Sequence, residues 1–352
     1  MIGALVYDDY LSLLKNNKII GLKDNKSQIQ PSSVDLSLSD ECYEIKTSFL
    51  SPNCRVRDKL KKNYSKKINL KNTKIFKKNK TYIVRLNETL NLNSNLNGHC
   101  NPKSSTGRLD IFCRTILDYC DEYEKIPKNY KGEMFLEITT RSFNIKFNEG
   151  DKLNQMRLNK KTSLYLNDES LKKINRINPL IFTNKDNIID NGLKLSVDLS
   201  NDNKVCAYVA KNISSFIDFS KIKFYNFSKF WKPIKPNKKT LIIKKNNFYI
   251  LRSKEKIRIP NNLAGEMIAY DTSIGDFRVH YAGFFDPGFG DTKGSYAVLE
   301  VKTNELPFMI EDGQTIARIK YEKLNKKTSI IYGSKIKSNY QNQKLALSKH
   351  FK

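Results

Sequence analysis

The segment TYIVRLNETLNLNSNLNG (81–98) has a second version, FYILRSKEKIRIPNNLAG (248–265), with Tyr, Arg, Glu, Asn, Leu and Gly at matching places. Both versions carry runs rich in β-branched and aromatic residues, which favour β-strands. A match of this length within one chain indicates an internal duplication. We therefore expect two similar β-rich units in tandem.

Three further pairs of similar segments occur in the same order in both halves. They are PSSVDLSL (31–38) with KLSVDLSN (194–201), KSSTGRL (103–109) with DTSIGDF (271–277), and KGEMFLEI (131–138) with GSYAVLEV (294–301). Because all four matches keep one order, duplication explains them better than chance. We assign the first unit to residues 1–165 and the second to 166–352, with the Asn- and Lys-rich stretch around 159–190 as the linker.

The hydrophobic pattern predicts a mainly β fold with a few short helices. Runs such as TLIIKK (240–245) and YAVLEV (296–301) recur about every 8–12 residues between Asn, Gly and Pro, which is typical of sandwiches and barrels. The segment YDDYLSLLKN (7–16) fits a short helix with acidic residues in its first turn. The tail from about residue 333 lacks strand alternation, and we expect it to be mobile.

Composition excludes several classes of protein. The chain has 352 residues, 39% of them hydrophobic, which is enough for a sizeable core. No apolar run approaches the roughly 18 residues of a membrane span. Asp8 and Asp9 precede any long apolar stretch, which argues against a signal peptide and for a cytoplasmic protein with no membrane partner.

The formal net charge is +27, a value that invites a nucleic-acid partner. The excess is mostly Lys scattered among Asn and Ile, however, and no stretch is typical of a recognition helix or an RNA-binding aromatic motif. We therefore expect no nucleic-acid partner. The same field would steer a small polyanionic substrate toward the protein.

Cysteine and histidine patterns exclude a zinc site. The six Cys include no C-x-x-C pair, so we expect them to be reduced and structural. None of the three His lies in an H-x-E, H-x-x-x-H or H-E-x-x-H motif. Zinc hydrolases and zinc base deaminases both need such clusters.

Two segments carry candidate chemistry in turns. KSSTGR (103–108) places two Ser, a Thr, a Gly and two cations together, which suits a phosphate cradle, although a polar surface turn has the same composition. Asp286-Pro287-Gly288 is a turn signal between aromatic runs. Its Asp could bind a sugar hydroxyl, or the segment could be an ordinary hairpin tip.

A glutamate interrupts an apolar strand once in each half. Glu137 lies in FLEI and Glu300 in VLEV. If such a carboxylate points inward, burial raises its pKa toward that of a general base. If it points outward, it is an ordinary solvent-facing residue of an alternating strand.

In combination, the segments I-Q-P-S-S-V-D-L, S-S-x-x-R, D-P-G-F and L-E, followed by a tail with Tyr and Gln, resemble the dCTP deaminases of the dUTPase-like superfamily. The length and the tandem repeat resemble the long alphaproteobacterial type. This resemblance implies two dUTPase-like distorted β-barrels of jelly-roll type, and a homotrimer in single-domain relatives with sites between subunits. It also implies a metal-free reaction without zinc, in which Mg²⁺ rides on the triphosphate.

The resemblance also assigns the site residues. The catalytic residues would be Ser104, Arg108 and Glu300, with Glu137 as the second candidate for the base. The nucleotide-binding residues would be Lys103, Ser104, Ser105, Arg108, Asp286, Tyr332, Tyr340 and Gln343.

Each repeat departs from the family pattern in a different half. Pro127 stands where the first repeat should carry the sugar-binding Asp, and Asp276 stands where the second should carry the Arg. Lys103 also replaces the usual Arg, which exchanges a bidentate fork for a point charge. We therefore expect one composite site per chain, with the phosphate loop from the first repeat and the hairpin and Glu300 from the second.

The resemblance implies that the protein converts dCTP to dUTP with release of ammonia, which supplies dUTP and dUMP for thymidylate synthesis. A bifunctional enzyme that continues to dUMP has nearly the same motifs. A plain dUTP diphosphatase fits the S-S-x-x-R and L-E pattern less well. A non-catalytic regulator that binds deoxynucleotides would explain the degenerate repeats, but not the complete set of residues kept across them.

Overall fold

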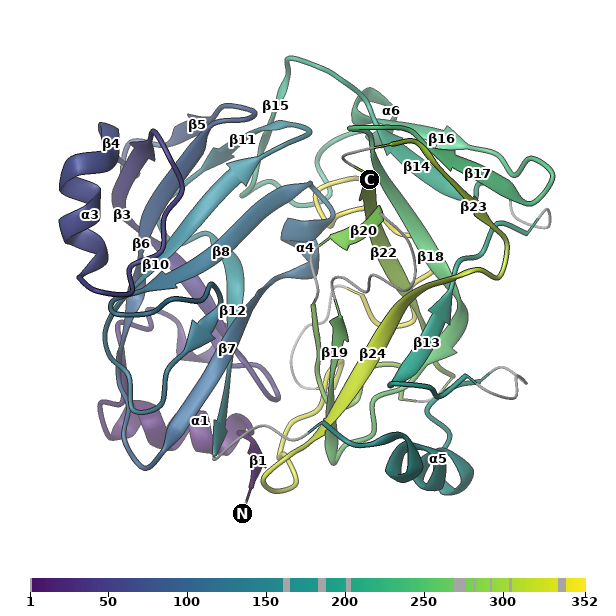
Figure 1. The fold of residues 1–352 in the computed structure, drawn as a ribbon, viewed down its shortest axis with the longest axis horizontal. Coiled ribbons are helices and arrows are strands. Elements are labelled where there is room, and N and C mark those ends of the chain that lie inside the picture. The colour runs from purple at the N-terminus through teal and green to yellow at the C-terminus, as the bar shows by residue number, and fades with distance from the viewer. Residues whose placement is uncertain are drawn as a thin grey trace. The chain divides into compact units, whose positions relative to one another are not determined.

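A computed structural model describes residues 2–160, 165–182, 188–200, 204–268, 277–280, 283–291, 293–303, 306–334 and 340–352. The chain divides into two compact units. The first unit comprises Met1–Ser163, Ile213–Tyr225 and Leu324–Ser329, and the second comprises Leu164–Asn212, Asn226–Lys323 and Ile330–Lys352. Both are mainly β, as the sequence predicts (Figure 1).

The first unit is built around one antiparallel sheet whose strands differ in length. Its elements are β1 (Gly3–Ala4), α1 (Tyr7–Lys15), β2 (Ile19–Ile20), α2 (Asn25–Gln28), β3 (Val34–Ile45), α3 (Val56–Asn63), β4 (Tyr64–Asn69), β5 (Lys74–Phe76), β6 (Thr81–Asn91), β7 (Leu96–Pro102), α4 (Ser104–Gly107), β8 (Ile111–Leu117), β9 (Lys125–Ile126), β10 (Lys131–Thr140), β11 (Asn144–Phe147), β12 (Lys152–Lys160) and β15 (Phe216–Asp218). The main path of the sheet runs β8-β10-β6-β3-β12-β7-β9. Because β8 also contacts β7 and β9, the path nearly closes into a barrel.

The second unit repeats this arrangement. Its elements are α5 (Asp168–Ile177), β13 (Leu193–Ser196), β14 (Ala207–Ala210), α6 (Phe227–Phe230), β16 (Trp231–Ile234), β17 (Thr240–Ile243), β18 (Phe248–Ile257), β19 (Leu263–Ile268), β20 (Phe277–His280), β21 (Phe284–Phe285), β22 (Ser295–Thr303), β23 (Phe308–Glu311) and β24 (Thr315–Lys323). One sheet runs β16-β14-β18-β22-β20 and another β13-β24-β19-β21. The pairs β18–β22, β22–β20, β24–β19 and β13–β24 match β6–β10, β10–β8, β12–β7 and β3–β12 of the first unit.

A buried serine–glutamate contact is present once in each unit and corrects one of the sequence matches. The amide and hydroxyl of Ser37 donate to the Glu88 carboxylate at 2.9 and 2.7 Å. Ser196 donates to Glu255 in the same way, at 2.8 and 2.5 Å. Ser37, rather than Ser33, is therefore the counterpart of Ser196, and the match of PSSVDLSL with KLSVDLSN is out of register.

The predicted helix over residues 7–16 is confirmed as α1. The Asp9 carboxylate accepts from the Val6 amide at 3.0 Å at the start of the helix, where acidic side chains stabilise the positive end of the helix dipole. The buried Tyr10 hydroxyl accepts from the Leu158 amide of β12 at 2.9 Å. These contacts fix α1 on the first unit.

The expectation of a linker around 159–190 is wrong for much of that stretch. It contains α5, which begins after Asn167, whose side chain accepts from the Ser170 amide at 3.0 Å. Leu171 of α5 is fully buried in the core of the second unit. The Asn- and Lys-rich composition conceals a capped helix with one apolar face.

Candidate functional site

The KSSTGR segment forms the single turn α4 at the end of β7. The Thr106 and Gly107 amides donate to the Lys103 carbonyl, and the Thr106 hydroxyl donates to the Leu153 carbonyl of β12 at 2.8 Å. Ser105 and Arg108 are buried, whereas Ser104 is half-buried. Packing against β12 therefore gives the turn a fixed shape in the first unit.

The ammonium group of Lys103 forms an ion pair with the buried Asp35 of β3. A cation in an ion pair offers less net charge to a phosphate than a free one. The charge that Lys103 could offer to an anion is therefore partly offset within the unit itself.

Glu137 and Glu300 occupy equivalent positions in the two units. On one side Glu137 is opposite Ile83 of β6, and Glu300 is opposite Ile250 of β18. On the other side Glu137 faces Arg114 of β8, whereas Glu300 is in register with residue 280 of β20. Both glutamates are buried, with 1% and 4% of their surfaces exposed. The strands thus hold both carboxylates inside, as the inward alternative requires.

Arg114 and Tyr123 lie close to Glu137. Oε1 of Glu137 accepts from the Arg114 guanidinium at 2.6 Å, and this guanidinium lies 3.5 Å from the centre of the Tyr123 ring. Burial raises the pKa of Tyr123, with a smaller contribution from Glu137. Oε2 of Glu137 is buried without a hydrogen-bond partner among the described residues. An arginine between an aromatic ring and the carboxylate therefore covers one side of Glu137.

The Asp-Pro-Gly segment forms the predicted turn after β21. The Phe289 amide donates to the Asp286 carbonyl at 3.1 Å. Gly288 has φ +92°, a backbone angle that residues with a side chain rarely adopt. The first unit has the same turn, in which the Tyr130 amide donates to the Pro127 carbonyl at 3.2 Å. Pro127 therefore stands at the position of Asp286, as the sequence predicts.

The tail lies on this turn in the second unit. The Tyr332 amide donates to the Pro287 carbonyl at 2.8 Å. The side chain of Gln343 donates to the Tyr296 carbonyl of β22 at 2.8 Å. The Tyr340 hydroxyl accepts from the Lys349 amide at 3.2 Å, which closes the tail on itself. The structure thus brings Tyr332 to the turn that carries Asp286.

The end of the tail is anchored, which corrects the expectation of a mobile segment for residues 340–352; residues 335–339 of that segment lie outside the described residues. Phe351 is 8% exposed and lies against Phe230 and Trp231, with ring centres 5.6 and 6.1 Å apart. Single aromatic side chains at a chain end carry no strand periodicity, so sequence alternation does not detect this contact.

We expect Phe351→Ala to lower the free energy of unfolding of the second unit by about 2–4 kcal/mol, because it removes a buried aromatic ring. Urea unfolding followed by the fluorescence of Trp231 measures the change. Ile177, which is 87% exposed and belongs to the same unit, is the control, and its replacement by Ala should cost less than about 0.5 kcal/mol. Equal effects of the two changes would contradict an anchoring role for Phe351.

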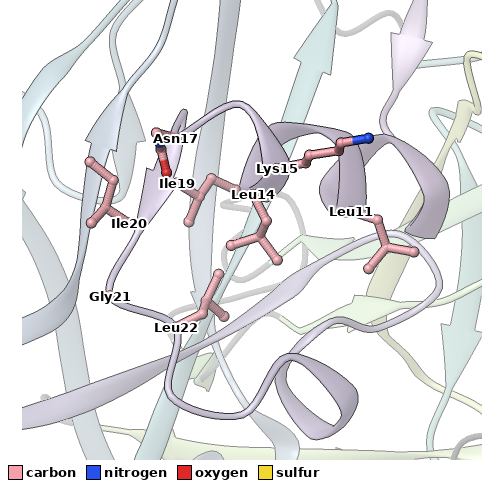
Figure 2. A pocket seen from close by; sticks show the side chains of 8 residues that line it. All are labelled: Leu11, Leu14, Lys15, Asn17, Ile19, Ile20, Gly21 and Leu22. Atoms are coloured by element: carbon pink, nitrogen blue, oxygen red, sulfur yellow. The ribbon is translucent and has the colours of Figure 1, made fainter.

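A pocket in the first unit lies apart from the predicted site residues. It is formed by α1, β2 and the segment that follows (Figure 2), and its lining residues are Leu11, Leu14, Lys15, Asn17, Ile19, Ile20, Gly21 and Leu22. The lining is mostly aliphatic and includes no carboxylate or hydroxyl group. It therefore lacks the groups that the predicted chemistry needs.

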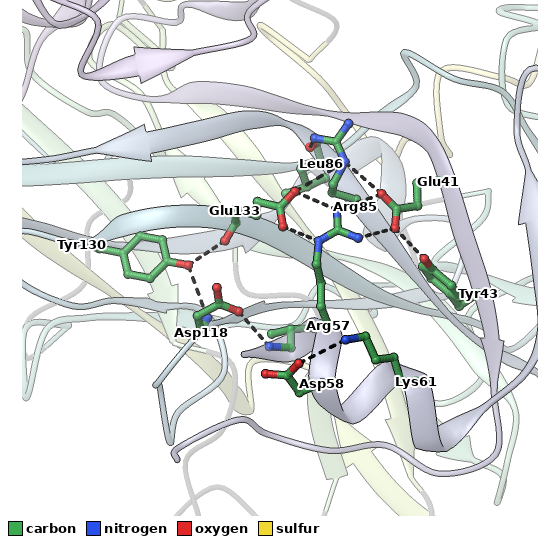
Figure 3. Close-up of polar contacts among 11 residues, drawn as sticks. Glu41, Tyr43, Arg57, Asp58, Lys61, Arg85, Leu86, Asp118, Tyr130 and Glu133 are labelled. Carbon is green, nitrogen blue, oxygen red and sulfur yellow. Dashed lines mark hydrogen bonds and ion pairs between the residues drawn. The ribbon is translucent and has the colours of Figure 1, made fainter. Parts of the chain in front are cut away.

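A charge network on the first unit also lies apart from the predicted residues (Figure 3). Arg57 of α3 donates to Glu41 of β3 at 2.7 Å and to Glu133 of β10 at 2.6 Å. Burial acts to raise the pKa of Glu41, but hydrogen bonds from Arg57 and Tyr43 hold it below its ordinary value. The network ties α3 to two strands, and its role is structural.

The remaining expectations concern the Asp276 segment, the cysteines, metal sites and membrane-spanning helices. Asp276 and the residues before it in the segment, 271–275, lie outside the described residues. All six cysteines are described and form no disulfide. Within the described ranges, no three His, Cys, Asp or Glu side chains gather in a way that could hold a metal ion. No helix of the described chain has the length and apolar character needed to cross a membrane.

The two mainly β units, with the one-turn segment after β7 in the first and the Asp-Pro-Gly turn in the second, define a β protein with two tandem domains. Residues 2–162 match the family described as "2'-deoxycytidine 5'-triphosphate deaminase (DCD) N-terminal domain". Residues 167–351 match "2'-deoxycytidine 5'-triphosphate deaminase (DCD), C-terminal domain". The chain therefore belongs to the dCTP deaminase family.

A solved structure supports this assignment. The chain is similar to the crystal structure of 2'-deoxycytidine 5'-triphosphate deaminase from Agrobacterium tumefaciens, with 36% sequence identity and a TM-score of 0.88. The similarity covers 93% of this chain and 99% of that one. A comparison with curated protein sequences found no match.

Sequence reasoning missed Gln341 and Arg114. Gln341 contacts the Asp-Pro-Gly turn directly, through backbone groups of Gly288 and Gly290. Arg114 pairs with Glu137 across neighbouring strands. The only sequence signal for Gln341 was its position two residues before Gln343. The pairing of Arg114 with Glu137 is determined by strand register, which sequence does not give.

Proposed function

We propose that the chain deaminates dCTP to dUTP with release of ammonia, at one composite site built from both domains. The observation that carries the proposal is that each domain keeps a different half of the required set. The first domain keeps Ser104 and Arg108, and the second keeps Asp286 and the tail. The enzyme would supply dUTP, and through it dUMP, for thymidylate synthesis in the cytoplasm.

The contacts within each unit support the choice of Glu300 as the base. The turn before β10, the strand of Glu137, carries Pro127, which has no carboxylate for the sugar. Glu300 shares its domain with the turn that carries Asp286 and with the tail that lies on it. Glu137 is the second candidate, because its Oε2 has no partner among the described residues.

In the proposed reaction, a water molecule attacks C4 of cytosine while Glu300 takes one of its protons. A C4–O bond forms as the electron pair of the C4=N3 bond moves to N3. The C4–N4 bond then breaks, and the proton passes from Glu300 to the departing amine, which leaves as ammonia. The second proton of the water ends on N3, which gives the uracil ring with its C4 carbonyl. The Ser104 hydroxyl would hold the water. The buried guanidinium of Arg108 would stabilise the glutamate anion and the charge that develops on the ring.

The remaining predicted residues would bind the substrate. Lys103 and Ser105 would contact the triphosphate together with Ser104 and Arg108. Asp286 would accept a hydrogen bond from the deoxyribose, and Tyr332, Tyr340 and Gln343 would close over the nucleotide. Mg²⁺ would enter as part of the substrate, bound to the phosphates of dCTP.

Product analysis tests the proposal. Purified protein is incubated with dCTP and Mg²⁺, and dUTP, dUMP and pyrophosphate are separated and quantified. Accumulation of dUTP with an equal amount of ammonia is the expected result. Formation of dUMP and pyrophosphate instead would indicate the bifunctional reaction, and binding of dCTP without turnover would indicate a regulator.

The oligomeric state is a separate part of the proposal. By resemblance to single-domain relatives, the chain would form a homotrimer with no nucleic acid or membrane partner. Sedimentation equilibrium of the purified protein measures the mass of the assembly directly. A mass of three chains is expected, and a mass of one chain would show that a single chain holds the complete site.

We expect Asp286→Ala to weaken nucleotide use by about 10- to 150-fold, because it removes one charge-assisted hydrogen bond, worth about 1.5–3 kcal/mol. Steady-state kinetics with dCTP measures the effect as an increase in KM. Pro127→Asp is the control at the equivalent turn, and it should neither raise the activity nor rescue Asp286→Ala. A rescue would show that the first turn can serve the site.

A further inference from the structure

The side chain of Gln341 bridges two backbone groups of the turn that carries Asp286. Its Oε1 accepts from the Gly290 amide at 3.2 Å, and its Nε2 donates to the Gly288 carbonyl at 3.1 Å. One side-chain amide thus satisfies a donor and an acceptor on either side of Phe289. We call this pair of hydrogen bonds the Gln341 clip.

Glycines on both sides make the close approach possible. A Cβ at Gly288 would lie 2.8 Å from Cβ of Ile331 and 3.1 Å from the Tyr332 amide nitrogen. A Cβ at Gly333, which has φ +81°, would lie 3.3 Å from the side chain of Gln341. Backbone of the turn and backbone of the tail therefore pack together without intervening side chains.

The equivalent turn of the first unit is held in a different way. Asn129 takes the place of Gly288, its amide donates to the Leu96 carbonyl at 2.8 Å, and its side chain accepts from the Asn95 amide at 2.9 Å. This turn is closed by Asn95 and Leu96 at the start of β7. Dependence on the tail is thus a property of the turn with the carboxylate.

We propose that Gln341 is a positioning residue that couples docking of the tail to the placement of Asp286. The proposal rests on the proposed function, in which Asp286 binds the sugar of dCTP. When the tail is docked, the clip fixes the Gly288–Gly290 backbone that follows Asp286. Two neutral hydrogen bonds lost together correspond to about 5- to 150-fold in an equilibrium constant.

Gln341→Ala tests the kinetic part of this proposal. We expect KM for dCTP to rise about 10-fold while kcat stays within about twofold, since the variant leaves the reacting groups in place. Gln341→Glu keeps the acceptor for Gly290 but places a carboxylate oxygen against the Gly288 carbonyl, so KM should rise at least as much as in Gln341→Ala. Lys344→Ala, at an exposed neighbouring position, should leave KM unchanged.

Amide hydrogen exchange at Gly290 tests the clip without relying on turnover. We expect dCTP to slow exchange at this amide in the wild-type protein and to have no such effect in Gln341→Ala. Equal exchange in the two proteins, or an unchanged KM, would overturn the proposal. If the wild type binds dCTP without deaminating it, the proposed function fails while the exchange result still decides the role of Gln341.

A purely structural role has its own signature. Trp231 is the single tryptophan of the chain and lies against Phe351 at the anchored end of the tail. We expect its emission and the melting temperature to be unchanged in Gln341→Ala. A shift in both, in proportion to the change in KM, would show that Gln341 only holds the tail in place and would overturn the positioning role.

Discussion

Glu300→Gln is expected to abolish dCTP deamination, with a loss of at least about 10²–10⁴-fold, while nucleotide binding survives. The amide has nearly the shape of the carboxylate, but it cannot take a proton from water. Glu300 is 4% exposed within β22, so a change of shape at this position would also disturb packing, and glutamine avoids that. Release of ammonia measures turnover, and calorimetric titration with a non-reactive dCTP analogue measures binding.

Glu137→Gln is the matched control, because Glu137 holds the same place in β10 of the first unit. We expect nearly normal turnover in this variant. It should lose some stability, because a neutral amide replaces the carboxylate that forms an ion pair with the Arg114 guanidinium at 2.6 Å. If Glu137→Gln is inactive and Glu300→Gln is active, the base belongs to the first unit and the composite site is wrong.

The duplication could be predicted because strands repeat a simple period and turns use few residue types. Leu299 and Val301 flank Glu300 on its strand, and the structure buries all three. The equivalence of Pro127 and Asp286 also follows from sequence, since each opens a turn between two apolar runs. Local signals of this kind survive when most of the surrounding sequence has changed.

Register and side-chain pairing could not be predicted in the same way. The letters SVDLS occur in both halves, yet Ser37 and Ser196 are equivalent because each contacts a buried glutamate of a neighbouring strand. A slip along a strand leaves the letters unchanged and alters every partner. The pairing of Arg114 with Glu137 depends on register too.

Contacts of the tail have a related explanation. Gln341, Asn342 and Gln343 are three consecutive residues with amide side chains that follow Tyr340. Nothing in the residue type distinguishes Gln341 from the other two. Its contacts with the turn depend on Gly288 of the turn and Gly333 of the tail, which allow close approach. Such complementarity between distant segments becomes visible only in three dimensions.

Arg108→Ala is expected to reduce deamination by about 10²–10³-fold, the effect typical of losing one preorganised donor to a developing charge. Arg108 is 2% exposed, so its replacement could also change the stability of the protein. The melting temperature of Arg108→Ala is therefore compared with that of Arg108→Lys, which keeps the charge and loses the planar fork. Partial activity in Arg108→Lys together with none in Arg108→Ala would assign the effect to the charge.

Asp276→Ala, at the matching place of the second repeat, should change activity little, because a composite site uses the loop of the first repeat only. The number of nucleotides bound per chain distinguishes one composite site from a separate site in each domain. Titration with a non-reactive dCTP analogue should give one nucleotide per chain. Two equivalent nucleotides per chain, or a strong effect of Asp276→Ala, would show that each domain builds its own site, since complementary halves can make only one.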